Sequence, residues 1–228
     1  MARGQWSPTG VQGVHASDID PTGVRWEKHT YRDVWEELSG YRRDGRTLVV
    51  GVDGHSGSGK TALARGLAAL DSGIATVHTD DLAWPHPSFD WGQQLIDHVL
   101  APLRRGDVPI VYRPPAWGER DRPGAICVSA DAAAVLVEGV GSCRREVRSF
   151  LDATVWVHAR PDVARRRVIA KGVDTDVFIY DWMTQENAFL AEQRPWESAD
   201  LLVAGELGQP SRNGSFGNVV TAAGPGGG

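Results

Sequence analysis

Residues 54–61 read Gly-His-Ser-Gly-Ser-Gly-Lys-Thr, a spacing of residue types that suits a phosphate group. Glycines let such a loop turn its backbone N–H groups toward phosphate oxygens, at the positive end of the helix that follows. Lys60 would bridge the β- and γ-phosphates of a nucleoside triphosphate, and the Thr61 hydroxyl would hold Mg²⁺. The residues expected to bind the triphosphate are Gly54, Ser56, Gly57, Ser58, Gly59, Lys60 and Thr61.

Acidic side chains follow two of the predicted strands, at the edge of the sheet where ligands of such folds bind. Asp80 and Asp81 come directly after the run Ile74–Thr79, and Glu138 ends the run Ala134–Glu138. The Asp80 carboxylate could accept the proton of an acceptor hydroxyl, and Glu138 could hold Mg²⁺ through water or a substrate hydroxyl. Helix capping by these side chains is the alternative interpretation.

The elements that must position these residues alternate between short β-rich runs and helical stretches. The expected strands are Thr47–Val52, Ile74–Thr79, Ala134–Glu138, Thr154–His158 and Leu201–Val203. The expected helices are Tyr31–Tyr41, Lys60–Leu70, Trp91–Arg105, Pro161–Lys171 and Val177–Glu192. We therefore expect an α/β, three-layer P-loop NTPase fold, in which helices flank a five-stranded, mostly parallel sheet.

Length and composition favour one working domain. The chain has 228 residues, 41% of them apolar, which is enough for one core and short for two. Residues 25–204 would form this domain. Residues 1–24 and 205–228 are rich in glycine and polar residues without periodicity, so we expect flexible segments at both ends.

Bulk properties argue against several classes of partner. A net charge of −5 provides no broad positive field for nucleic acid, and no run approaches the roughly 18 apolar residues that span a membrane. The start of the chain lacks the apolar run of a signal peptide, and Cys127 and Cys143 have no metal-like spacing. We therefore expect a cytoplasmic protein with small-molecule partners. A homodimer is left open.

The rest of the chain favours a small kinase among proteins with such a loop. A GTPase normally reads guanine through an Asn-Lys-x-Asp element, and none of the asparagines at 187, 213 and 218 precedes a lysine. Two alternatives remain. One is a kinase-like ATPase or regulatory protein without a small-molecule acceptor. The other is a nucleoside monophosphate kinase, in which Arg113 and Arg120 could bind the acceptor phosphate.

The chain resembles the uridine kinase-like group of P-loop kinases, which includes nicotinamide riboside kinases, pantothenate kinases and phosphoribulokinases. The resemblance covers about residues 47–203. It depends on the glycine loop, Asp80-Asp81, Pro87-Ser88-Phe89-Asp90, Val111-Tyr112, Val137-Glu138-Gly139 and the arginines at 165–167. It implies ATP and Mg²⁺ as cofactors and a nucleoside-like or other small alcohol as the acceptor of the γ-phosphoryl group.

The resemblance also implies roles for single residues near the reacting groups. Asp80 would be the catalytic base, with Asp81, otherwise placed near the substrate, as the alternative if the alignment shifts by one. Glu138 would contact both metal and acceptor. The arginine-rich helix would form a lid over the phosphates. Since its residues turn about 100° apart, Arg166 or Arg167 would reach the phosphate, and the other arginines would be solvated.

Substrate-binding residues follow from the same resemblance. Asp90 falls near the place where such kinases bind a ribose hydroxyl pair, and Tyr112 near the place where uridine kinases line the base pocket. Trp117 stands where uridine kinases have a histidine that reads the pyrimidine. A tryptophan can stack on a ring but cannot offer the same hydrogen bonds, which argues against uridine itself.

Overall fold

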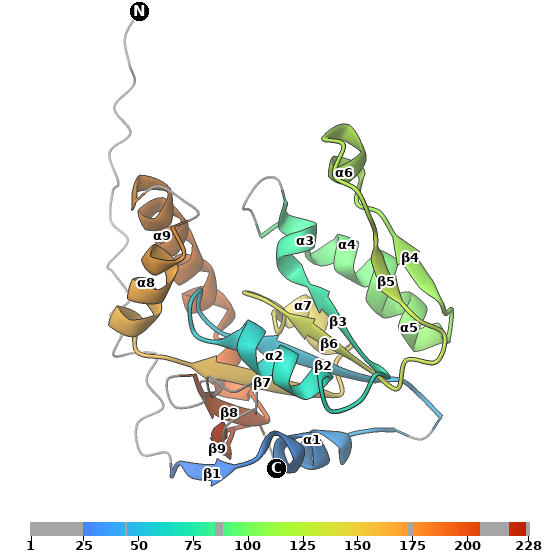
Figure 1. Cartoon of the computed structure of the whole chain (residues 1–228), viewed down its shortest axis with the longest axis horizontal. Coiled ribbons are helices and arrows are strands. Elements are labelled where there is room, and N and C mark those ends of the chain that lie inside the picture. The colour runs from blue at the N-terminus through green and yellow to red at the C-terminus, as the bar shows by residue number, and fades with distance from the viewer. Residues whose placement is uncertain (1–24, 44, 85–88, 173–175, 206–218, 227–228) are drawn as a thin grey trace, which may run out of the picture.

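The computed structural model describes residues 25–43, 45–84, 89–172, 176–205 and 219–226. Its centre is a seven-stranded sheet covered by helices on both faces, a three-layer α/β fold as predicted (Figure 1). In spatial order its strands are β1 (Glu27–His29), β9 (Val219–Ala223), β8 (Leu201–Ala204), β7 (Ala153–His158), β2 (Leu48–Asp53), β6 (Ala134–Glu138) and β3 (Ile74–His78).

Five of these strands run parallel, and they are the five that the sequence predicted. β2 lies between β6 and β7, while β3 and β8 pair on the outer sides of those two strands. Every residue of β2 and β6 is buried. Strands covered on both faces read as continuous apolar runs, which is why they stand out in the sequence. The central position of β2 places the glycine loop in the middle of one sheet edge.

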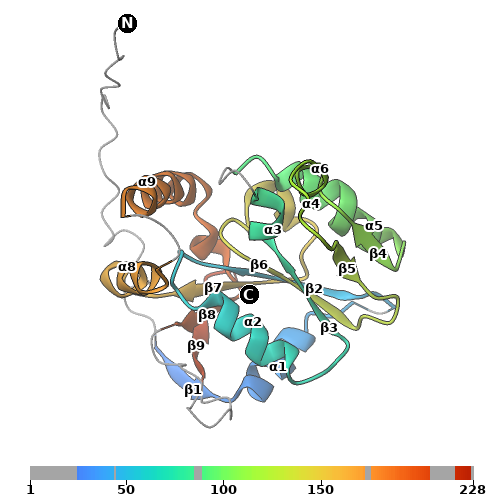
Figure 2. The same ribbon diagram turned by 45° about the horizontal axis from the view of Figure 1, so that its top comes forward.

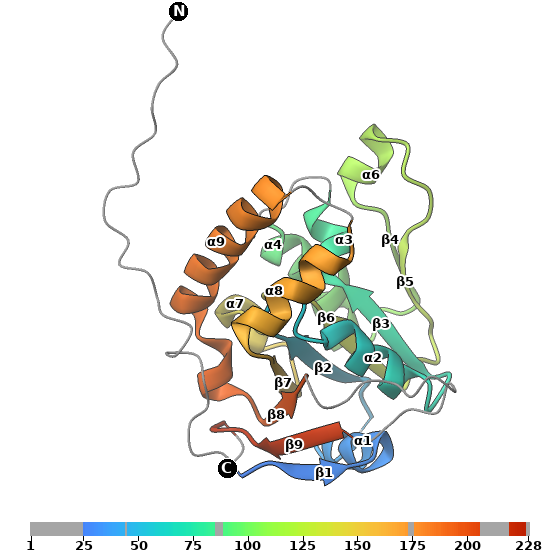
Figure 3. The same ribbon diagram turned by 60° about the vertical axis from the view of Figure 1, so that its left-hand side comes forward.

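Two further strands, β9 and β1, extend the sheet through antiparallel pairing, so the predicted count of five strands is too low. β9 pairs with β8 on one side and with β1 on the other (Figure 3). It falls within residues 205–228, which were expected to form a flexible tail. Val219 and Val220 are buried, and this short, mostly apolar run becomes a strand here because two neighbours pair with it. Residues 1–24 and 206–218 of the expected flexible ends lie outside the described residues.

The expected helices all form, with ends that differ from the predicted ones by a few residues. α1 (Tyr31–Ser39) and α2 (Lys60–Ala68) cover one face of the sheet, where Leu38, Leu63 and Leu67 pack against the strands. The other face carries α4 (Gly92–Leu95), η2 (Ile96–Leu100), α5 (Ala101–Arg105) and α7 (Arg145–Arg148). α4, η2 and α5 follow one another without a break as one helical stretch.

The remaining elements include a short helix after β3, a two-stranded arm and two helices that contact each other. α3 (Thr79–Ala83) begins directly after β3. A two-stranded arm of β4 (Ile110–Tyr112) and β5 (Ile126–Val128) carries α6 (Pro115–Glu119) between its strands. α8 (Pro161–Ala170) and α9 (Asp176–Gln193) contact each other on the opposite side, followed by η3 (Pro195–Ser198) (Figure 2).

Candidate functional site

The glycine loop joins the end of β2 to the start of α2, in the strand–loop–helix context that the sequence predicted. Gly57 has a φ of 78° and Gly59 a φ of 111°, values that residues with a side chain rarely adopt. A Cβ atom on Gly57 would also lie 2.3 Å from the carbonyl oxygen of Ala164 in α8. The glycines therefore allow a tight turn and let α8 pack directly against the loop.

Asp53, the last residue of β2, ties the glycine loop to the loop after β6. Its fully buried carboxylate accepts hydrogen bonds from the N–H groups of Gly54 (2.7 Å), Gly141 (2.9 Å) and Cys143 (2.9 Å). Burial raises the pKa of Asp53, although these hydrogen bonds and the charge of Lys60 act to lower it. Asp53 was not among the predicted site residues, although an acid within an apolar strand is itself a sign of a specific buried role.

The Lys60 ammonium is buried inside the loop. Its Nζ atom donates hydrogen bonds to the carbonyl oxygens of Gly54 (2.8 Å) and His55 (2.9 Å). Two loop carbonyls thus hold the charge that was predicted to bridge the phosphates. Because these hydrogen bonds already restrict the Lys60 side chain, binding of a phosphate would cost little further side-chain entropy.

Thr61 and Glu138 meet at the start of α2. The Thr61 hydroxyl donates to Glu138 Oε1 over 3.1 Å, and His78 Nδ1 lies 2.6 Å from Glu138 Oε2. Burial acts to raise the pKa of Glu138, but the hydrogen bond from His78 and the charge of Lys60 outweigh it, so the pKa is lowered. The hydrogen bond to Glu138 raises the pKa of His78. His78 was missed, although it ends the predicted strand that precedes the acids.

The oxygens of Thr61 and Glu138 fit the donor set that Mg²⁺ prefers. Within the described ranges, no group of three or more His, Cys, Asp or Glu side chains could hold a metal ion. Mg²⁺ usually keeps several waters and binds through one or two protein oxygens together with substrate phosphates. Two oxygens beside a phosphate loop match that pattern, whereas they would not make a complete site for the metal alone.

Asp80 lies in the first turn of α3, beside these groups. The residue is exposed. Protein atoms around its carboxylate nevertheless desolvate the group, and this desolvation raises its pKa. The charge of Lys60 acts to lower this pKa and that of Glu138 to raise it, so both groups lie within electrostatic reach. The structure thus brings together the residues predicted as base, phosphate-binding lysine and metal ligand, while their roles remain predictions.

The neighbouring Asp81 contacts the arm instead. Its carboxylate forms an ion pair with Arg122, and its carbonyl oxygen accepts a hydrogen bond from Trp117 Nε1 at 2.8 Å. The Arg122 guanidinium lies 3.8 Å from the centre of the Trp117 ring, which is only 4% exposed. A substrate ring could stack on Trp117 only if Arg122 moved away. Asp81 and Trp117 could therefore make the predicted contacts with a substrate only by losing contacts within the protein.

The other predicted substrate residues, Tyr112 and Asp90, interact with different partners. Tyr112 stacks on His98, with ring centres 4.1 Å apart, and its hydroxyl donates to Gln94 Oε1 over 3.4 Å. These contacts turn the tyrosine toward the helical stretch α4–η2. Asp90 is exposed in the bend before α4 and lies within electrostatic reach of Arg144.

The two predicted lid arginines point to different partners. Arg166 pairs with Asp162 at 2.9 Å on an exposed side of α8. Arg167 Nη1 donates to the carbonyl oxygens of Gly57 (3.3 Å) and Gly205 (3.0 Å) and so lies against the glycine loop. Of the two, Arg167 has the placement expected of a residue near the phosphates.

Helix α9 supplies a contact to the loop that was not predicted. Glu186 Oε1 lies 2.9 Å from both Ser56 N and His55 Nδ1, and Trp182 Nε1 donates to Ser56 Oγ over 3.0 Å. Trp182 and Glu186 are four positions apart, and such residues share one face of a helix. In the predicted helix Val177–Glu192, Glu186 has the spacing of the apolar residues on one face. That pattern could have identified it as a buried glutamate.

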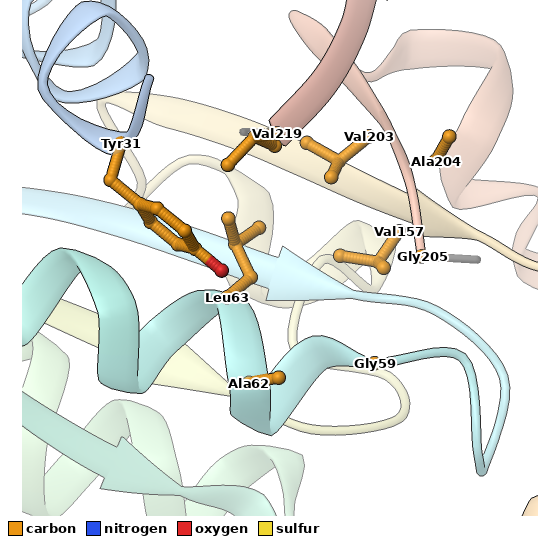
Figure 4. A pocket seen from close by; sticks show the side chains of 9 residues that line it. All are labelled: Tyr31, Gly59, Ala62, Leu63, Val157, Val203, Ala204, Gly205 and Val219. Carbon is orange, nitrogen blue, oxygen red and sulfur yellow. The ribbon is translucent and has the colours of Figure 1, made fainter. Parts of the chain in front are cut away.

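A small apolar pocket lies next to the loop (Figure 4). Ala62 and Leu63 of α2 line it together with Val157, Val203 and Val219 from three strands. Its volume is about 30 Å³, far below the roughly 300–1,000 Å³ of typical small-molecule pockets. In this conformation the pocket is too small for a nucleobase.

Comparisons with known proteins give structural similarity alone. No family model and no curated protein matches the chain. One similar solved structure is a possible uridine kinase from Bacillus stearothermophilus, with 23% identity, 75% of this chain and 97% of that chain covered, and a TM-score of 0.49. Another is a "putative fructose transport system kinase" from Silicibacter sp. TM1040, with 18% identity, 70% and 91% covered, and a TM-score of 0.45. At these levels, neither structure carries an argument about the function of this chain.

Proposed function

We propose that this chain is an ATP- and Mg²⁺-dependent kinase of the uridine kinase-like group, which transfers the γ-phosphoryl group to a hydroxyl of a small molecule. The observation that carries the proposal is the meeting of Lys60, Thr61 and Glu138 at the glycine loop, with Asp80 in electrostatic reach. A loop that only bound an anion would not need two carboxylates beside it. Carboxylates there suit metal binding and proton transfer.

The proposed reaction places one role on each of these residues. Asp80 orients the acceptor hydroxyl and takes its proton as the new oxygen–phosphorus bond forms and the bond to the β-phosphate oxygen breaks. Lys60 neutralises charge on the transferring group. Thr61 and Glu138 would hold Mg²⁺, which would supply further charge neutralisation. Because the transition state of such transfers is loose, placement and electrostatics provide most of the catalysis.

The lid arginine and the acceptor complete the proposed site. Arg167, which contacts the carbonyl oxygen of Gly57, is the arginine that we assign to the phosphates, in preference to the solvent-facing Arg166. We propose a nucleoside-like or other small alcohol as acceptor. Uridine is disfavoured, because Trp117 is packed beneath Arg122 and leaves no pyrimidine-reading side chain at that position.

A panel of acceptors tests the proposal. The purified chain is incubated with Mg·ATP and, one at a time, nucleosides, small sugars and alcohols, and nucleoside monophosphates, and ADP and phosphorylated product are measured. The proposal expects product with at least one hydroxyl acceptor that carries no phosphate. Slow ATP hydrolysis that no acceptor changes would instead indicate an ATPase or regulatory protein. Product with monophosphates alone would indicate a nucleoside monophosphate kinase.

We also propose that the protein acts in the cytoplasm on small molecules, without nucleic acid, as a single chain or a homodimer. Cys127 and Cys143 are free thiols, as is usual for proteins in a reducing compartment. Across the ranges that the structure describes, no helix is long and apolar enough to cross a membrane.

A further inference from the structure

One peptide unit of the glycine loop is held from both sides. The carbonyl oxygen of His55 accepts a hydrogen bond from Lys60 Nζ at 2.9 Å, and the N–H group of the next residue, Ser56, donates to Glu186 Oε1, also at 2.9 Å. The C=O and N–H groups of a trans peptide point in opposite directions. The loop lysine and the α9 carboxylate therefore hold the same peptide unit from opposite edges of its plane.

Glu186 sits in a site built for a carboxylate. The side chain is 1% exposed. Besides the Ser56 N–H group, its oxygens contact the Ser56 hydroxyl and His55 Nδ1, the latter at 2.9 Å. A buried carboxylate is costly unless several donors surround it. Three donors from two neighbouring loop residues meet that need, so the loop and the glutamate are mutually adapted.

The glutamate keeps its charge in this site. Burial by itself would raise the pKa of Glu186, but the hydrogen bond from His55 and the charges of His55 and Lys60 outweigh burial, and the pKa is lowered. Hydrogen bonds to a charged group are roughly twice as strong as those between neutral groups. The carboxylate is therefore a firm anchor for the loop.

Aromatic packing fixes the helix that carries this anchor. Trp182 stacks on Phe89 with ring centres 5.3 Å apart, and Phe89 stacks on Phe189 at 4.0 Å. Trp182 also donates its Nε1–H to Ser56 Oγ at 3.0 Å. The stack and the hydrogen bonds involve the same face of α9. A displacement of α9 would therefore pull on the loop at Ser56.

We propose that Glu186 is a positioning residue of the phosphate-binding loop, which fixes the His55–Ser56 peptide from α9, thereby aims Lys60, and couples the placement of α9 to nucleotide binding. This inference rests on the proposed function, because it assumes that the loop binds Mg·ATP. Glu186 acts through the peptide and Lys60, without touching the nucleotide itself. Its removal should therefore weaken nucleotide binding more than it slows the transfer step.

Binding and turnover measured together test this role. The Kd for Mg·ATP is measured by calorimetry for the wild type, Glu186→Ala, Glu186→Gln and the control Glu192→Ala, whose side chain is exposed on the same helix. Glu186→Ala should weaken binding on the order of tenfold, as losses of outer-shell partners do, with kcat at saturating ATP changing less. Glu186→Gln, which keeps an acceptor for the Ser56 N–H group, should recover part of the loss. The control should bind like the wild type.

The outcomes separate this inference from the proposed function. A wild type that does not bind Mg·ATP overturns both. A wild type that binds, with unchanged affinity in Glu186→Ala, overturns the positioning role alone, even if the melting temperature falls. Tighter binding by Glu186→Ala also overturns it, because the carboxylate would then oppose the nucleotide. If Glu186→Ala does not fold, Trp182→Phe takes its place, because it removes one hydrogen bond to Ser56. This variant should bind Mg·ATP a few-fold more weakly. Unchanged affinity in Trp182→Phe would overturn the positioning role.

Discussion

The Thr61 hydroxyl donates a hydrogen bond to Glu138 Oε1 over 3.1 Å, although the two residues are 77 positions apart in the chain. Thr61 lies in the first turn of α2, and Glu138 ends β6, which pairs with the strand before the glycine loop. The parallel pairing of β2 with β6 therefore brings the two oxygens together. The geometry of the proposed metal site therefore depends on the pairing of β2 with β6.

Replacement of Glu138 by Gln should weaken the binding of the Mg²⁺ that turnover requires. The amide keeps the size of the side chain but removes the charge that attracts a divalent cation. We expect the Mg²⁺ concentration for half-maximal rate to rise by at least about tenfold. The measurement is the initial rate across a Mg²⁺ titration at fixed ATP. Glu119→Gln, an exposed change on α6, serves as control, and identical titration curves for both variants would contradict the assignment.

Replacement of Lys60 by Ala should nearly abolish transfer. The variant loses the cation proposed to neutralise the transferring group, and removal of one such contact costs on the order of 10²–10³ in rate. Acceptor-dependent ADP formation measures the effect. Lys28→Ala removes an exposed lysine from β1 and should retain full activity. Near-normal turnover in Lys60→Ala would remove the central assignment.

Turnover should fall in acid, with a midpoint above the ordinary pKa of an aspartate, about 3.9. Desolvation raises the pKa of Asp80, and a base must be deprotonated to act, so the rate rises with pH through the raised pKa. Asp80→Asn should lower kcat on the order of 10²–10⁴ and leave ATP affinity within about twofold. Profiles of kcat between pH 4 and pH 8 and calorimetric Kd values provide the comparison.

The same shift predicts the stability of that variant. A carboxyl whose pKa is higher in the folded than in the unfolded state makes folding less favourable as pH rises from the unfolded to the folded pKa. Asp80→Asn should therefore be at least as stable as the wild type at pH 7. A variant that loses stability at pH 7 would contradict the stability predicted from this shift, and near-normal kcat would exclude Asp80 as base.

Replacement of Gly66 by Ala should destabilise the helix that follows the loop. A Cβ atom there would lie 2.1 Å from the buried Tyr31 ring, so the ring or one of the two helices must shift, and overpacking of this kind costs about 1–3 kcal/mol. Gly118→Ala on α6 meets open space and should stabilise by at most about 1 kcal/mol, since alanine is the better helix former. The free energy of unfolding in urea measures both, and equal values would contradict the close packing of Tyr31 on Gly66.

Local patterns predicted the elements and most of the proposed catalytic groups. The five parallel strands read as apolar runs because both faces are covered, and the glycine loop has a fixed spacing from Gly54 to Thr61. Asp80 and Glu138 follow or end such runs. Because the carboxyl ends of parallel strands meet at one edge, these residues could be expected to lie close together.

Partner choice among similar side chains could not be predicted. Sequence treats Arg166 and Arg167 alike, yet one pairs with Asp162 in solvent and the other contacts the glycine loop. The reason is the rotation of about 100° between consecutive helix residues, combined with the face of α8 that packs on Gly57. The burial of Trp117 beneath Arg122 likewise depends on how the arm folds back on α3.

The order of the elements, the glycine loop and the acids at the ends of strands can be predicted from local patterns, because each depends on residues close together in the chain. It takes the folded structure to show that Val219–Ala223 pairs with β8 and that Glu186 contacts Ser56, which lies 130 positions away. Such contacts depend on the packing of distant segments. The sequence around Glu186 is the same whether its side chain is exposed or buried against another segment. The same holds for the short run Val219–Ala223.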